Sequence, residues 1–277
     1  AEAVQASWCP TATVVEGSAA DDPAGGLLRE EFTLAAASGL SGVEVGSGCQ
    51  WGAEYCLVKA IDPAAGTITL GRGCVDTLPS PHAPGERIWF FDGFEAIDPV
   101  EYSAGQTVDL KAVTRASSDQ LQVSAAPTSS VVMASRAARP YPPANVRLNG
   151  EYFPEQLTGT VTVQLSHRNR VAQGESVLDY TAAGPALETG ATYTLETYDT
   201  RTDALLWSEP GVTADTVELP DPALASQMRL EIATVIGGLE SWQRFRHEFI
   251  WGSLIVGEAY TAYALETYHV ELEMPGG

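Results

Sequence analysis

Hydrophobic and polar positions alternate in short runs along this chain, and helical periodicity is nearly absent. The runs span roughly five to nine residues, are rich in β-branched and aromatic side chains, and end at Gly, Pro, Asn or Asp, as is typical of a β-sandwich or barrel. The clearest helical candidate, residues 27–32, is short, and Thr33 and Leu34 after it can equally continue a strand. The sequence therefore predicts an all-β protein.

In the first half of the chain, the pattern predicts a β-barrel or sandwich-like domain over residues 1–138. The composition of residues 62–66, between two of its strands, favours a hairpin loop. Three consecutive aromatic residues at 89–91 indicate a strand that is buried on both faces. The strands predicted for this domain are residues 11–15, 54–61, 67–70, 87–91, 107–113, 121–123 and 131–133.

A proline-stiffened segment separates the two halves of the chain. Pro140, Pro142 and Pro143 hold the backbone near polyproline II and cannot continue a ladder of hydrogen bonds. Residues 145–148 then alternate polar and apolar as a half-buried strand does, and Asn149-Gly150 closes them with a turn. We therefore predict a domain boundary near Arg139.

The second half predicts a seven-stranded immunoglobulin-like sandwich over residues 139–251. Strict alternation places Val161, Val163 and Leu165 on one face of a strand. This half contains no cysteine, so its core alone must hold it together. Residues 252–277 predict a C-terminal β-hairpin that needs the first domain or a neighbouring subunit as a partner. The predicted sandwich strands are residues 145–148, 160–165, 191–198, 205–207, 216–219 and 228–235, with Gly237-Gly238 as a turn before a last strand that opens at Trp242.

Residues 139–150 resemble a recurring segment of bacteriophage or gene-transfer-agent-like tail-tip and baseplate hub proteins, where a proline-rich run opens a fibronectin type III-like module. Residues 71–78, the loop of His82 and Gly85, the Trp89 strand and residues 102–108 follow the same order as in those proteins. The resemblance covers residues 55 to 250 and contains no catalytic motif.

This resemblance implies a structural, non-catalytic role in tail assembly, with host attachment as an additional role. The implied location is the tail tip or baseplate of a virion, after assembly in the host cytoplasm. The implied partners are other tail proteins and copies of the chain itself in a homo-oligomeric ring such as a trimer. A host-surface glycan or receptor is a further implied partner.

Charge limits the partners further. The chain has 15 Lys and Arg against 36 Asp and Glu, a formal net charge of -21. Such a field repels nucleic acid, whose binding relies on basic side chains that neutralise phosphates. No run reaches the roughly 18 apolar residues that span a bilayer, so we expect no membrane insertion. Because the chain begins Ala1-Glu2-Ala3, we expect a processed chain or a piece of a longer protein.

All four cysteines, Cys9, Cys49, Cys56 and Cys74, lie in the first domain. They permit two disulfides in three connectivities, of which Cys49 with Cys56 closes a short loop, or they are buried free thiols. Zinc does not suit them, because structural zinc sites bring ligands in as closely spaced pairs and no histidine pair lies nearby. We therefore expect no metal and no cofactor.

The residue types of a catalytic centre are scattered. His82, His167, His247 and His269 are spread along the chain, and no nucleophile elbow or Cys/His signature accompanies them. We therefore expect no enzyme. The resembling tail proteins have a similar His-Arg-Asn-Arg stretch at the end of a strand, so the resemblance implies that residues 166–170 form a loop held by charge-assisted hydrogen bonds. Residues 199–203 predict a turn rather than a calcium site, because the Gly and Glu of an EF-hand loop are missing.

Trp51 is the aromatic residue with the best claim to a ligand. Gly48 and Gly52 flank it, which suggests an exposed loop where its ring stacks on a glycan. The first alternative function is therefore a carbohydrate- or receptor-binding module at a virion or cell surface, and an open aromatic face would favour it. The second is a hydrolase, which a concave site with two perturbed carboxylates or a Ser/His pair would favour.

Overall fold

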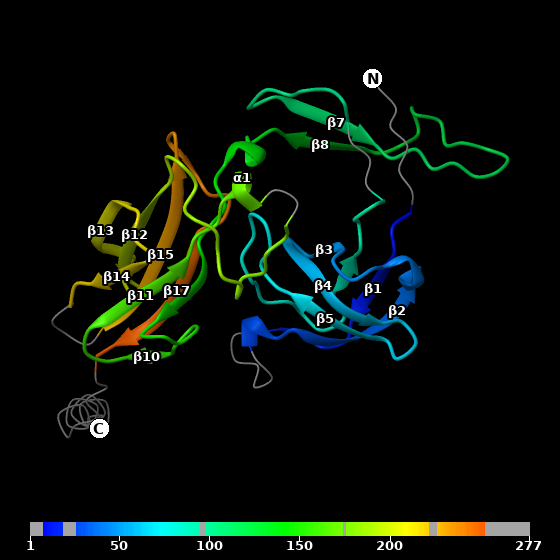
Figure 1. Ribbon diagram of the computed structural model, residues 1–277. Helices are drawn as coiled ribbons and strands as arrows, with labels where there is room; N and C mark the ends of the chain where they lie inside the picture. Colours follow the sequence, from blue (N-terminus) through cyan, green and yellow to red (C-terminus); the bar gives the residue numbers. More distant parts are fainter. Residues whose placement is uncertain (1–7, 19–25, 95–97, 174–175, 222–225, 253–277) are drawn as a thin grey trace, which may run out of the picture.

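The computed structural model describes residues 8–18, 26–94, 98–173, 176–221 and 226–252. Nearly all of its regular structure is strand, which confirms the predicted all-β class (Figure 1). Within these residues, none of the helices has the length and apolar character needed to cross a membrane. The predicted C-terminal hairpin lies outside the described residues beyond Gly252.

The first domain is a closed, six-stranded antiparallel barrel with the strand order β1-β2-β5-β4-β3-β6, in which β6 pairs back with β1. Closure leaves the barrel without a free edge. The 3-10 turns η1 (Gly26–Leu28) and η2 (Leu40–Gly42) flank β2. The barrel strands are β1 (Thr11–Val14), β2 (Glu31–Ser38), β3 (Gly48–Trp51), β4 (Glu54–Asp62), β5 (Thr67–Gly71) and β6 (Arg87–Trp89).

Alternate residues of these strands fill the barrel, and one prediction is corrected there. The candidate helical run 27–32 is η1 followed by the start of β2, so the strand alternative holds from Glu31 on, where Phe32 and Leu34 point inward. The strand at 87–91 is not buried on both faces. Ile88 and Phe90 are buried, but Trp89 between them is 44% exposed, because side chains in a strand alternate between the two faces.

A two-stranded hairpin follows the barrel. It pairs β7 (Thr107–Lys111) with β8 (Thr128–Val132), from Thr107 opposite Val132 to Lys111 opposite Thr128. Figure 1 shows it standing apart from the strands of the barrel and from the second domain. The strand predicted at residues 121–123 is wrong, since these residues lie in the connection between β7 and β8.

The second domain is a β-sandwich. One sheet has the order β14-β11-β9, and the other has the order β10-β17-β15-β12-β13 with β16 paired to β15. In immunoglobulin-like terms these orders are E-B-A and G-F-C-C′. The alternation predicted the strands, although the last strand begins at Phe245 rather than Trp242. Its elements are β9 (Ala144–Leu148), β10 (Gln156–Leu157), β11 (Val161–Ser166), α1 (Arg170–Gln173), β12 (Thr192–Asp199), β13 (Ala204–Val212), β14 (Thr216–Leu219), β15 (Ser226–Ile236), β16 (Leu239–Glu240) and β17 (Phe245–Trp251), preceded by η3 (Arg136–Ala138).

Barrel and sandwich are joined by polar contacts as well as by the linker. The backbone N–H of Tyr180 donates to the carbonyl of Arg72 at 2.7 Å, and Lys59 lies 2.8 Å from Asp179. The side-chain oxygen of Gln243, near the end of the sandwich, accepts from the backbone N–H of Leu78 at 2.7 Å. The contacts of Arg72 and Leu78 fix a loop of the barrel, residues 72–78, against the second domain, and that of Lys59 fixes β4.

Candidate functional site

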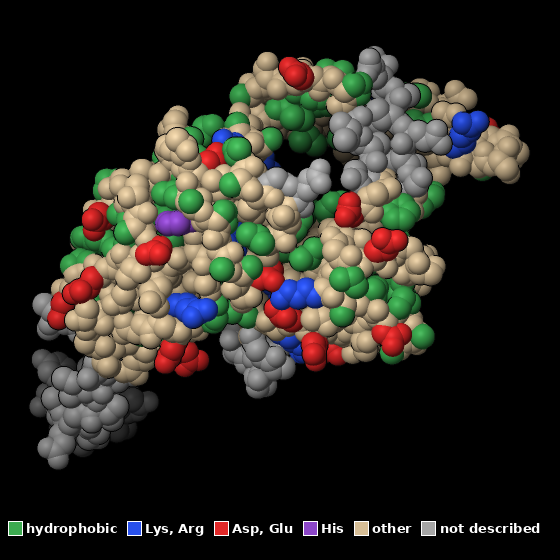
Figure 2. All heavy atoms as spheres, in the orientation of Figure 1, with side chains coloured by type: hydrophobic (Ala, Val, Ile, Leu, Met, Phe, Trp, Pro, Cys, Tyr) green, Lys and Arg blue, Asp and Glu red, His purple; other side chains and the backbone are tan. Residues whose placement is uncertain are grey.

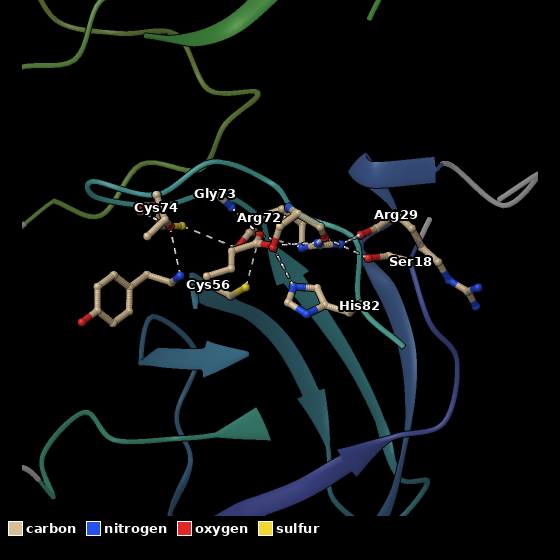
Figure 3. Close-up of polar contacts among 12 residues, drawn as sticks. Ser18, Arg29, Cys56, Arg72, Gly73, Cys74 and His82 are labelled. Carbon is tan, nitrogen blue, oxygen red and sulfur yellow. Dashed lines mark hydrogen bonds and ion pairs between the residues drawn. The ribbon is translucent and has the colours of Figure 1, made fainter. Parts of the chain in front are cut away.

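A cluster of buried charged side chains lies at one end of the barrel interior. Glu54 opens β4 and points inward on the same face as Cys56 and Val58. Arg72 follows the last residue of β5, and His82 lies in the loop that leads to β6. Figure 3 shows Arg72 and His82 converging from different elements. We call Glu54, Arg72, Ser80, His82 and Glu86 the barrel-end cluster.

Both carboxylate oxygens of Glu54 accept hydrogen bonds. Oε1 accepts hydrogen bonds from Arg72 Nε at 2.8 Å and the backbone N–H of Gly73 at 2.7 Å. Oε2 accepts from Arg72 Nη2 and from the backbone N–H of Ser80, both at 2.9 Å. Burial alone would raise the pKa of Glu54, but the hydrogen bond from His82 and the charge and hydrogen bonds of Arg72 hold it at about 2. The carboxylate is therefore a fixed buried anion.

The imidazole of His82 lies between two carboxylates. Its Nε2 is 3.0 Å from Glu54 Oε2, and its Nδ1 is 3.1 Å from Glu86 Oε2. Its ring stacks on Trp51 with centroids 3.9 Å apart and 11° between the planes. The guanidinium of Arg72 lies 5.1 Å from the Trp51 ring centroid, which adds a cation–π contact. Trp51 is thus a wall of the cluster.

The cluster has the spacing of a catalytic Ser-His-carboxylate triad. It lacks free backbone N–H donors for an oxyanion. Ser80 Oγ lies 3.3 Å from His82 Nε2, whose other ring nitrogen faces Glu86. However, Glu54 Oε2 is closer to the same ring nitrogen, and it also lies 3.2 Å from Ser80 Oγ. The nearby backbone N–H groups of Gly73 and Ser80 both donate to Glu54, so neither remains for an oxyanion. This geometry suits a structural ion-pair network better than acyl transfer.

The structure corrects the interpretation of Trp51. This residue is 0% exposed, because it is the last inward-facing position of β3 and not part of a loop. Gly52, with φ of 56°, makes the turn that follows β3. A buried ring offers no face for a glycan to stack on. The flanking glycines mark the ends of a short strand here. The sequence pattern alone did not distinguish such a strand from an exposed loop.

All four cysteines are free thiols in the structure, which matches the thiol alternative rather than the disulfides. Cys49 and Cys56 lie directly opposite each other on β3 and β4, so the pairing considered for them is spatially adjacent but not formed. Burial raises the pKa of the Cys56 and Cys74 thiols well above the usual range, which makes them unreactive. Among the described residues, no three His, Cys, Asp or Glu side chains are grouped as a metal site requires.

The predicted loop is formed by residues 167–169, between the end of β11 and the start of α1. Arg168 is buried and donates to the carbonyls of Asp179 and Ala182, and the Asn169 side chain accepts from two backbone N–H groups at the start of α1. His167 lies 2.9 Å from the Tyr193 hydroxyl. Residues 199–203 form a turn, in which Asp199 accepts from the backbone of Arg201 and Thr202. Among the remaining histidines, His247 contacts the Pro154 carbonyl, and His269 lies outside the described residues.

An open cleft of about 700 Å³ lies where the barrel meets the linker and the start of the sandwich. It is distinct from the barrel-end cluster, because none of the cluster's five side chains lines it. Sequence reasoning missed this cleft, whose walls come from segments far apart along the chain. Its lining residues are Tyr55, Val75, Asp76, Arg136, Ala137, Tyr141, Arg170 and Val171.

Comparison with known proteins does not assign the chain to a family. No protein-family model matches the sequence, and no curated protein matches it. The geometry of the molecule is therefore the basis for the functional proposals that follow.

Proposed function

We propose that this chain is a structural, non-catalytic component of a phage-type tail tip or baseplate that joins its neighbours through the hairpin of residues 103–133, which we call the β-arm. The proposal rests on the resemblance of residues 55 to 250 to tail hub proteins and on one structural observation. That observation is the exposure of the β-arm, whose strands have backbone edges and an apolar face open to a partner.

The β-arm is a two-stranded sheet, so each strand has one edge that pairs with no other described strand. All five residues of β8 are exposed, and in β7 only Val108 is half-buried. Val108 faces Val131 across the pair, and Leu110 faces Ser129, which places Val108, Leu110 and Val131 on one side of the ribbon. A hairpin of this kind is marginal alone in water, and its edges are templates for pairing with another chain.

Charge favours the β-arm as the contact surface. Residues 103–133 contain Lys111 and Arg115 against Asp109 and Asp119, so two positive and two negative charges give a net charge of zero, whereas the whole chain is at -21. Figure 2 shows most of the acidic side chains over barrel and sandwich, and hydrophobic side chains on the hairpin as well as on both domains. Two acidic bodies repel each other least where a neutral, apolar element meets the neighbour.

The experiment tests association through one face of the β-arm. We expect the full chain to form multimers at rising concentration in analytical ultracentrifugation, and Val131→Asp to shift it to monomer by placing a charge on the apolar face. Val132→Asp is the matched control, because Val132 is the next residue of the same strand and faces the opposite side. Immunogold labelling of tailed particles from the source genome should mark the tail tip. A chain that stays monomeric and is missing from such particles contradicts the proposal.

A further inference from the structure

We propose that the cleft between the barrel loop 72–78 and the linker segment 136–141 binds a saccharide that carries one carboxylate. This inference does not depend on the assembly role of the β-arm, which is a separate surface. It rests on four hydrogen-bond donors that line one cleft and on the way in which the protein fixes two of them.

Two arginines line the cleft, and each is anchored by a carboxylate behind it. Arg136 forms a two-pronged contact with Asp76 through Nε at 2.5 Å and Nη2 at 2.8 Å. Arg170 donates through Nε to Glu188 at 2.9 Å and through Nη1 to the Ala137 carbonyl at 3.0 Å. Within the described residues, Nη1 of Arg136 and Nη2 of Arg170 form no hydrogen bond. Each guanidinium is therefore held in place with one amino group left for a ligand, as fixed recognition of a carboxylate requires.

Two tyrosine hydroxyls add to this set of donors. Tyr55 and Tyr141 both line the cleft, and neither hydroxyl bonds to any residue in the part of the chain that the structure describes. Burial raises the pKa of Tyr141, so its hydroxyl keeps its proton at neutral pH. The carboxylate that lines the cleft is already engaged, because both oxygens of Asp76 accept from Arg136. A matching ligand must therefore be rich in acceptor oxygens.

The remaining walls and the charge of the chain favour a sugar over an acidic peptide. Val75, Val171 and the ring of Tyr141 supply apolar surface for the C–H face of a sugar ring, whereas the Arg136 guanidinium lies over the ring of Tyr55, 5.2 Å from its centroid. A volume of about 700 Å³ falls within the range of small-ligand sites. A peptide with several carboxylates would meet the repulsion of a chain at net charge -21, whereas an acidic monosaccharide brings a single carboxylate that can accept from the amino groups left free by the two carboxylate-paired arginines.

The backbone at Val75 is an independent indication of a built site. Val75 has φ of 59°, a left-handed conformation that is strained for a β-branched side chain. It lies in a turn in which the Thr77 N–H donates to the Cys74 carbonyl at 3.0 Å, and this turn presents Asp76 to Arg136. Such strain persists only where the surroundings enforce it, and it gathers at ligand sites.

Titration of the full chain with sodium galacturonate, N-acetylneuraminate and neutral galactose, followed by NMR of backbone amides, tests the inference. We expect the Tyr55, Val75 and Tyr141 amides to shift with at least one acidic sugar, and galactose to bind at least about 10-fold more weakly. Tyr141→Phe should weaken acidic-sugar binding about 3- to 10-fold, the range of one hydrogen bond. Tyr198→Phe is the matched control, because Tyr198 bonds Glu196 on β12 and does not line the cleft.

Thermal melting of Tyr141→Phe separates binding from folding, and an unchanged melting temperature with weakened binding supports the site. Three outcomes overturn the inference: none of these amides moves with either acidic sugar, galactose binds as tightly as galacturonate, or Tyr141→Phe and Tyr198→Phe weaken binding equally. Titration with a Glu-containing tripeptide completes the test. If the tripeptide moves the same amides at lower concentration than either sugar, the cleft is a peptide site and the proposal fails.

Discussion

The barrel and the sandwich are both β structures with apolar cores, but different interactions hold them together. The sandwich closes on a continuous apolar core that includes Val163, Tyr193, Leu195 and Leu230. The barrel has an apolar core as well, yet one end of it is built on the buried Glu54 and Arg72. Removing part of an apolar core costs contacts, whereas removing one member of a buried ion pair leaves the other charge in a place that water cannot reach.

The largest effect is expected at Glu54. Glu54→Gln keeps the shape of the side chain but leaves Arg72 buried without its counter-charge, and we expect a loss of about 3–5 kcal/mol in the free energy of unfolding. Urea unfolding at pH 7 measures it. Glu248→Gln is the control, because Glu248 forms a surface pair with Arg246 in which both side chains are more than half exposed, and a change of at most about 0.5 kcal/mol is expected there. Equal effects of the two substitutions would contradict the comparison.

A second prediction distinguishes the domains by pH. The pKa of Glu54 is lowered from its ordinary 4.5 to about 2 in the folded chain. A depressed carboxyl pKa stabilises the fold above pH 4.5, and this contribution is lost as the pH falls towards 2. The difference corresponds to about 3 kcal/mol. Unfolding followed between pH 5 and pH 2.5 should show this loss in the intact chain and a flatter profile in Glu54→Gln.

The sandwich supplies the contrast for this pH experiment. Leu230→Ala opens a cavity in its core and should cost about 2–5 kcal/mol. No ionisable group is removed, so the pH profile of Leu230→Ala should run parallel to that of the unsubstituted chain. If Leu230→Ala flattened the profile as Glu54→Gln does, the two domains would not differ in the way proposed.

The sequence predicted the strands of the sandwich better than those of the barrel. The sandwich strands follow from alternation, because Val161, Val163 and Leu165 repeat at the period of a strand and the turns between strands contain Gly or Asp. The missed strand β3 is four residues long with a glycine at its start and another just after its end, and its pattern is indistinguishable from a loop. Pairing with β4 and β6, which no local pattern reports, makes it a strand.

The barrel-end cluster could not be predicted for a related reason. Glu54, Arg72 and His82 are far apart along the chain, and they meet only because closure of the barrel brings the ends of β4 and β5 to the loop before β6. One signal was present. Glu54 occupies an inward-facing position of an alternating strand, in register with Cys56 and Val58, and a charge at such a position demands a buried partner. Nothing local identifies which cation that partner is.

The smallest effect is expected at the contact between the two domains. Lys59 bridges them, with its Nζ 2.6 Å from Glu30 of the barrel and 2.8 Å from Asp179 of the sandwich. Lys59→Met keeps the apolar stem and removes the charge, and because the side chain is 31% exposed we expect a loss of at most about 1 kcal/mol. Lys111→Met, at the other lysine of the chain, is the control, because Lys111 bonds the Val123 carbonyl within the β-arm.

Calorimetric unfolding of Lys59→Met is a second measurement. The number and width of the unfolding transitions are more informative than the loss of free energy. If the two domains unfold as one unit through contacts such as that of Lys59 with Asp179, Lys59→Met should broaden the transition or split it into two, while Lys111→Met leaves it single. The remaining contacts, Tyr180 with Arg72 and Gln243 with Leu78, are unchanged in this variant, so partial uncoupling is the expected result. Two separate transitions already present in the unsubstituted chain would show that barrel and sandwich unfold independently and that this interface contributes little.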